Sequence, residues 1–113
     1  MKKILLLSLL ILACSCSSTK IENRNILIGY FSYFADAPLF IDCKTNEKYP
    51  VAMEDDYIFL EEEYLKIAES PGQRILISLN GRFDERNDME GEGKRIFLIV
   101  NKLVNIFPYE VCE

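Results

Sequence analysis

The chain has 113 residues, with 13 Lys and Arg side chains against 18 Asp and Glu, a formal net charge of -5 at pH 7 and no histidine. The acidic balance argues against a nucleic-acid-binding protein, because neutralising phosphates requires clustered Lys and Arg. Without histidine the chain lacks the commonest metal ligand and the commonest general base, so no metal site, cofactor or catalytic residue is predicted.

Residues 1–13 have the pattern of a secretory signal peptide. Lys2 and Lys3 precede an apolar run over residues 4–12, which is shorter than the about 20 apolar residues that a membrane span needs. The end of this run is similar to a bacterial lipobox, so Cys14 is predicted to be the lipidated first residue of the mature chain. Cys16 is the competing anchor, and an exported protein without lipid is the remaining alternative.

Residues 14–25 are interpreted as the lipidated cysteine and a polar tether, because they show no apolar period. Removing residues 1–13 would leave 11 basic against 18 acidic side chains. The predicted location is the bacterial cell envelope, with the lipid anchored in a membrane. We expect this to be the outer membrane, with the domain facing the periplasm.

Residues 26–53 predict three strands. The first is apolar or aromatic on both faces, which is typical of a strand buried on one face and partly covered on the other. Gly29 within it indicates a bend or bulge, and Pro50 is tolerated near the start of the third strand. The expected elements are a strand over residues 26–35, a turn at 36–38, a strand at 39–43, a hairpin loop at 44–48 and a strand at 49–53.

From Asp55 the apolar period lengthens towards 3.6, which predicts an amphipathic helix. Asp55 or Asp56 is expected to cap its first turn, and residues 70–72 to end it. The glutamates at 61–63 are interpreted as a solvated surface, because consecutive helical residues point in different directions. The face expected to be buried carries Tyr57, Leu60, Tyr64 and Ile67 or Ala68.

The last third of the chain predicts two further strands. Residues 74–83 alternate again, with a bend at Gly81, and the polar residues 84–94 favour a loop. The final strand is expected over residues 95–107 and stops at Pro108.

The predicted element order is therefore β-β-β-α-β-β. This is the order of an OB-fold, a five-stranded Greek-key barrel. The fold class is all-β with one helix, in one domain over residues 26–113 after the lipoprotein signal peptide. A generic small α+β domain is the alternative.

Cys43 and Cys112 are the candidates for a disulfide. Export to an oxidising compartment favours the oxidised form. A domain of about a hundred residues also gains from a covalent staple, because its core is small.

Four segments carry a family resemblance, in the order YFSYFADAPLFIDCKT, LEEEYLKI, ILISLNGRF and IFPYEVC. Together they resemble the C-terminal OB domain of the NlpE family of bacterial envelope lipoproteins, over about residues 26–112. The resemblance implies a non-enzymatic, anchored protein whose single disulfide maps to Cys43 and Cys112. It also implies a link to copper homeostasis, surface sensing and a two-component envelope stress response. We expect the chain to lack the family's N-terminal barrel with its CxxC pair, which puts in doubt any signalling or metal role that depends on that half.

The favoured function is a protein-interaction module of the envelope, with a partner that the sequence does not identify and a disulfide that is structural or redox-responsive. The alternative is a glycan-binding or small-ligand-binding OB-fold lipoprotein, since aromatic side chains can stack on such ligands. Copper binding by this domain is not expected, because Met53 and Met89 are isolated and histidine is absent. The candidate ligand face comprises Tyr30, Tyr33, Phe40 and Tyr49.

Overall fold

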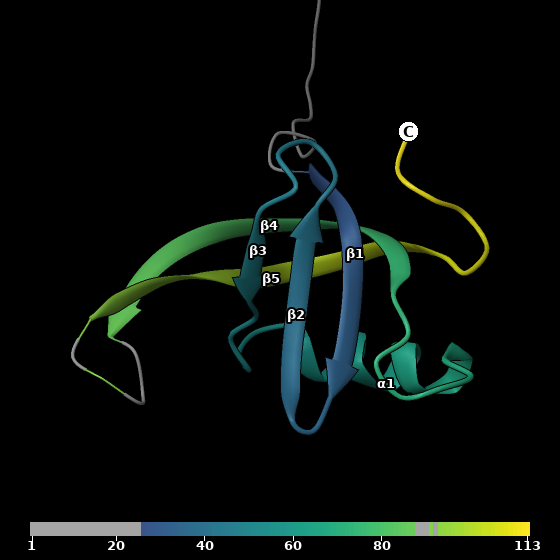
Figure 1. Ribbon diagram of the computed structural model, residues 1–113, viewed down its shortest axis with the longest axis horizontal. Coiled ribbons are helices and arrows are strands. Elements are labelled where there is room, and N and C mark those ends of the chain that lie inside the picture. Colours follow the sequence, from purple (N-terminus) through teal and green to yellow (C-terminus); the bar gives the residue numbers. More distant parts are fainter. Residues whose placement is uncertain (1–25, 88–90, 92) are drawn as a thin grey trace, which may run out of the picture.

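The computed structural model describes residues 26–87, 91 and 93–113 (Figure 1). The predicted signal peptide, Cys14, Cys16 and the tether lie outside these residues. In the part of the chain that is described, no helix is long and apolar enough to cross a membrane.

The predicted order of three strands, a helix and two strands is confirmed. The elements are β1 (Ile26–Phe34), β2 (Ala37–Asp42), β3 (Lys48–Pro50), α1 (Tyr57–Ile67), β4 (Ile75–Asn87) and β5 (Lys94–Phe107).

The strands form one antiparallel sheet in the order β3-β2-β1-β4-β5, which curls until its two ends meet. A parallel bridge between Val51 and Leu98 joins the segment after β3 to β5. In Figure 1, β1, β2 and β3 cross in front of the long β4 and β5 strands, and α1 lies at one end of the barrel. This is the OB-fold architecture that the sequence predicts.

The core lies between the two crossing layers and α1. Phe31 of β1 is fully buried, and its ring makes edge contacts with the rings of Tyr57 and Tyr64, at centroid distances of 6.4 and 5.2 Å. The predicted helix face is confirmed, since Tyr57, Leu60 and Tyr64 are buried. The Tyr64 hydroxyl also donates to the Gln73 carbonyl oxygen at 2.7 Å, which connects the helix to the approach to β4.

The first turn lies one residue earlier than predicted. Ala35 and Asp36 form it, with φ angles of 54° and 62°, and Pro38 belongs to β2 opposite Tyr33. Two left-handed residues are typical of the tight turns that match the twist of a β-hairpin. Asp tolerates that conformation. The sequence therefore predicted a turn correctly, but placed it at residues 36–38 instead of at Ala35 and Asp36.

The predicted loop over residues 84–94 is wrong in its first part. β4 continues to Asn87, and its pairing with β5 extends to Lys94. Residues 84–87, the β4 strand of this arm, are polar because the arm projects from the barrel (Figure 1). The hydrogen bonds between paired strands do not require apolar side chains where the strand faces are solvated. Arg86 holds the arm to the barrel through Glu54, and this hydrogen bond lowers the pKa of the Glu54 carboxyl.

Asp56 occupies the N-cap position of α1 but does not cap it through its side chain, so this part of the prediction is wrong. Its carboxylate instead accepts a hydrogen bond from the Leu103 backbone N–H at 2.9 Å. The pairing of β4 with β5 is irregular at that point, between Ser78 and Leu79. The Asp56 carboxylate therefore accepts the hydrogen bond of a backbone N–H that the bulge leaves without a partner in the neighbouring strand.

A second irregularity lies beside Gly81, between Asn80 and Gly81, as the sequence predicted. Gly29 differs, because its pairing with Asp42 and Ile77 shows no register shift. Glycine is required there for close approach: a Cβ would lie 2.2 Å from the Ile41 carbonyl oxygen. The third strand is also shorter than predicted and ends at Pro50.

Candidate functional site

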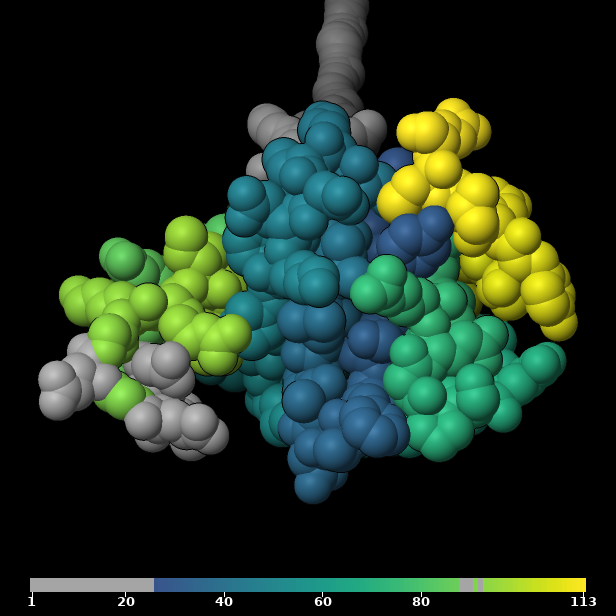
Figure 2. All heavy atoms as spheres, viewed as in Figure 1, coloured from purple at the N-terminus to yellow at the C-terminus, as the bar shows by residue number. Residues whose placement is uncertain are grey.

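The C-terminal residues 108–113, here called the tail, leave β5 and turn back beside the start of β1. The Glu110 N–H donates to the Phe107 carbonyl oxygen at 3.3 Å, which begins the turn. Figures 1 and 2 show the tail in yellow, lying next to β1. It covers the outer side of the barrel, away from Phe31.

Two contacts hold the tail in place. Cys112 forms a disulfide with Cys43, with a Cα–Cα distance of 5.6 Å. The Cys112 N–H also donates to the Tyr30 hydroxyl oxygen at 2.9 Å. Both contacts involve the same tail residue, so the tail is attached close to its end.

The chain around Asp42 positions Cys43 for this bridge. Asp42 is buried, and its carboxylate accepts a hydrogen bond from the Lys44 N–H at 2.9 Å. Its carbonyl oxygen accepts from Asn46 at 2.8 Å, which closes the turn after β2. The Cys43 N–H donates to the Ile28 carbonyl oxygen at 2.9 Å, so Cys43 is fixed directly beside β1.

The outer face of β1 beneath the tail is apolar. Tyr30, Leu76 and Phe107 are paired in register across β1, β4 and β5, so they lie side by side on this face. Leu76 is only 6% exposed although it points away from the core. The sequence predicted a first strand partly covered on its second face, and the tail is part of that cover.

A groove of about 480 Å³ remains between the tail and this face, and we call it the tail groove. Its floor is apolar, with Ile28 47% exposed, and the disulfide forms part of its wall. Such a surface suits the apolar side chains of a partner. The groove itself is also lined by both acidic and basic side chains. The lining residues are Ile26, Leu27, Ile28, Asp42, Cys43, Lys44, Leu76, Phe107, Glu110, Val111, Cys112 and Glu113.

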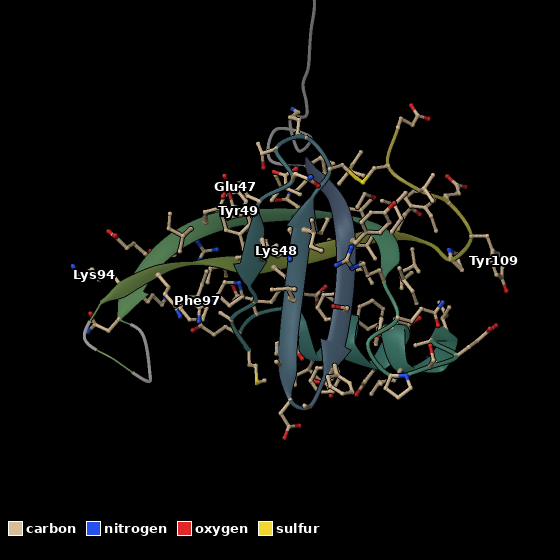
Figure 3. All side chains as sticks on the ribbon, in the orientation of Figure 1. Glu47, Lys48, Tyr49, Lys94, Phe97 and Tyr109 are labelled. Atoms are coloured by element: carbon tan, nitrogen blue, oxygen red, sulfur yellow. A yellow bond between two sulfur atoms is a disulfide. The ribbon has the colours of Figure 1, made fainter. Side chains whose placement is uncertain are left out.

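The four aromatic residues of the predicted ligand face do not lie together. Tyr30 contacts the tail, whereas Tyr33 lies at the other end of β1 and donates to Asp36 at 2.9 Å. Phe40 is fully buried, so its assignment to a surface is wrong. The ring of Tyr49, labelled in Figure 3, packs against that of Phe83 at a centroid distance of 4.4 Å and an interplanar angle of 38°. These residues therefore offer no shared stacking surface to a glycan.

Sequence reasoning missed the tail groove itself. The signals that could have found it were the apolar second face of β1 and the apolar Val111 beside Cys112. Within residues 26–87, 91 and 93–113, no group of three or more Cys, Asp or Glu side chains is arranged to hold a metal ion.

Comparisons with known proteins place the fold in a family. The family model of the NlpE C-terminal OB domain matches residues 21–113. The crystal structure of the Cpx pathway activator NlpE from Escherichia coli is similar, with a TM-score of 0.63 and 24% sequence identity. The match covers 84% of this chain and 50% of that chain, so the present chain corresponds to about half of it. A search of curated protein sequences found no match.

Proposed function

Because the chain belongs to the family of NlpE C-terminal OB domains, we propose that it is a lipid-anchored, non-enzymatic protein of the bacterial cell envelope that docks a protein partner in its tail groove. Membership of the family supports the envelope location. The similar E. coli protein is described as a Cpx pathway activator, which supports a partner in envelope stress signalling. Cys14 remains the proposed site of lipid attachment, and the outer membrane the proposed location.

The observation that carries the docking proposal is the open apolar floor of the tail groove. Ile28 of β1 and Val111 of the tail both line the groove and are 47% and 69% exposed. Neither side chain contributes much to the core, and apolar side chains grouped in a concave surface are typical of interaction sites.

Partner docking at this site is proposed to depend on the oxidation of Cys43 and Cys112 to a disulfide. The two contacts that hold the tail both depend on the position of Cys112, which the bridge fixes. Without the bridge, one wall of the groove is free to leave while the barrel strands remain paired. The bridge is thus proposed to stabilise the domain and to keep the groove formed, so reduction weakens partner docking.

Replacing Ile28 by Glu is expected to weaken signalling without unfolding the domain. Overproduction of the native full chain in bacteria with an envelope-stress reporter is expected to induce the reporter. Ile28→Glu is expected to lower that induction by about tenfold, since a buried carboxylate at the docking site costs at least 1.4 kcal/mol of affinity.

Ile96→Glu is the matched control, because Ile96 is 48% exposed on the β5 arm and does not line the groove. It is expected to leave induction unchanged. Equal induction by the Ile28 and Ile96 variants, at equal protein levels and melting temperatures, would contradict docking in the groove.

A further inference from the structure

A second cleft, of about 450 Å³, lies at the other end of β1, between the β1–β2 turn and the end of α1. We call it the turn–helix cleft and define it by Phe34, Leu65, Ala68, Glu69 and Pro71, which line it. Figure 2 shows the β1–β2 turn in blue beside the green α1 region at the lower edge of the molecule. This cleft shares no lining residue with the tail groove.

The connection from α1 to β4 builds one side of this cleft. It turns at Gly72, which has a φ of 75° and would bring a Cβ to within 3.5 Å of the Phe34 Cβ. The Gln73 N–H donates to the Ser70 carbonyl oxygen at 3.2 Å, which closes the turn. The cleft is therefore formed by ordered backbone on both sides.

The cleft exposes large apolar side chains that the core does not use. Phe34 is 60% exposed and Leu65 is 54% exposed. Ile58, which is 58% exposed, lies two helical turns before Leu65 on the same face of α1. Grouped exposed apolar side chains of this size indicate an interaction surface.

The charges around this surface are acidic. Glu69 lines the cleft and Asp36 lies beside it, where it accepts the hydrogen bond of Tyr33. That hydrogen bond, with the nearby charges of Asp36 and Glu61, raises the pKa of the Tyr33 hydroxyl. The one lysine of the helix, Lys66, is already paired with Glu63 at 2.9 Å. The cleft therefore favours an incoming cation.

We propose that the turn–helix cleft binds a basic amphipathic segment of a partner protein. The apolar side chains of that segment pack against Phe34 and Leu65, and its Lys or Arg side chains lie against Glu61 and Glu69. The Phe34 ring also offers a face to a cation. This site goes beyond the function proposed above, since it is independent of the tail groove and of the disulfide. An anionic membrane surface fits poorly, because the acidic rim would be repelled.

The test uses a synthetic amphipathic peptide of Lys and Leu, about 14 residues long, and the purified full chain. Fluorescence anisotropy is expected to show binding that weakens when salt is raised from about 50 mM to about 500 mM. The double variant Phe34→Ser, Leu65→Ser is expected to weaken binding by at least about tenfold, which corresponds to 1.4 kcal/mol. The double variant Glu61→Gln, Glu69→Gln, which leaves the apolar surface intact, is expected to weaken binding to a similar degree.

Two controls make the outcome decisive. Ile96→Ser removes an apolar side chain of comparable exposure, 48%, from the β5 arm and is expected to leave peptide binding unchanged. Ile28→Glu in the tail groove is also expected to leave it unchanged, so this proposal and the proposed function can fail separately. Binding that is insensitive to both cleft variants, or equal binding of a Glu and Leu peptide, would overturn the proposal. Binding of anionic lipid vesicles that the same cleft variants abolish would also overturn it and would assign the surface to a membrane.

Discussion

Replacing Cys43 and Cys112 together by serine is expected to lower the free energy of unfolding by about 4 kcal/mol. The bridge has a sequence separation of 69, so it encloses most of the barrel and greatly restricts the unfolded chain. A loss of that size is a large fraction of the about 5–15 kcal/mol that stabilises a typical domain. Urea denaturation of the oxidised native chain and of the double variant measures the difference.

Val111→Ser is the control for this prediction, because Val111 belongs to the same tail, is 69% exposed and takes no part in the bridge. It is expected to change the free energy of unfolding by less than about 0.5 kcal/mol. A loss below about 1 kcal/mol in the cysteine variant would mean that the bridge does not constrain the unfolded chain as the loop-entropy argument requires. In that case the bridge would serve mainly to hold the tail.

Replacing Gly29 by alanine is expected to destabilise the domain by about 3 kcal/mol. The added Cβ would lie 2.2 Å from the Ile41 carbonyl oxygen and 2.6 Å from the Phe40 Cζ. Relief requires moving either the backbone of β2 or a fully buried ring, and both are held by the core. Thermal or urea unfolding of the variant gives the magnitude.

Gly93→Ala is the matched control, since no atom lies within 4 Å of a Cβ added there. The same substitution at this position is expected to be neutral or slightly stabilising, because alanine reduces the entropy of the unfolded chain. Similar stabilities for the two variants would contradict the close approach of β1 and β2 at Gly29.

The order of the strands and the helix could be predicted from the spacing of apolar residues along the chain. This spacing differs between strands and helices, and it depends only on residues that are close in sequence. The buried face of α1 followed directly from the spacing of Tyr57, Leu60 and Tyr64. The irregularity at Gly81 was also predictable, since glycine within a strand is a signal of a bulge. These features depend on neighbours along the chain.

The features that could not be predicted depend on contacts between distant residues. Asp56 looked like a helix cap but binds the Leu103 N–H, which lies 47 positions away. Phe40 looked available for stacking, yet it fills the core against Gly29 because β1 and β2 approach so closely. The tail groove exists only because the bridge folds the tail back over Tyr30, and no local pattern specifies such a return.

Photo-crosslinking in intact envelopes tests whether a protein partner docks in the tail groove. A photoreactive phenylalanine derivative is placed at Val111 of the full chain, and at Ile96 as a control. We expect a discrete protein adduct from position 111 that disappears in combination with Ile28→Glu, and no such adduct from position 96. The absence of an adduct at position 111, or the same adduct from both positions, would contradict it.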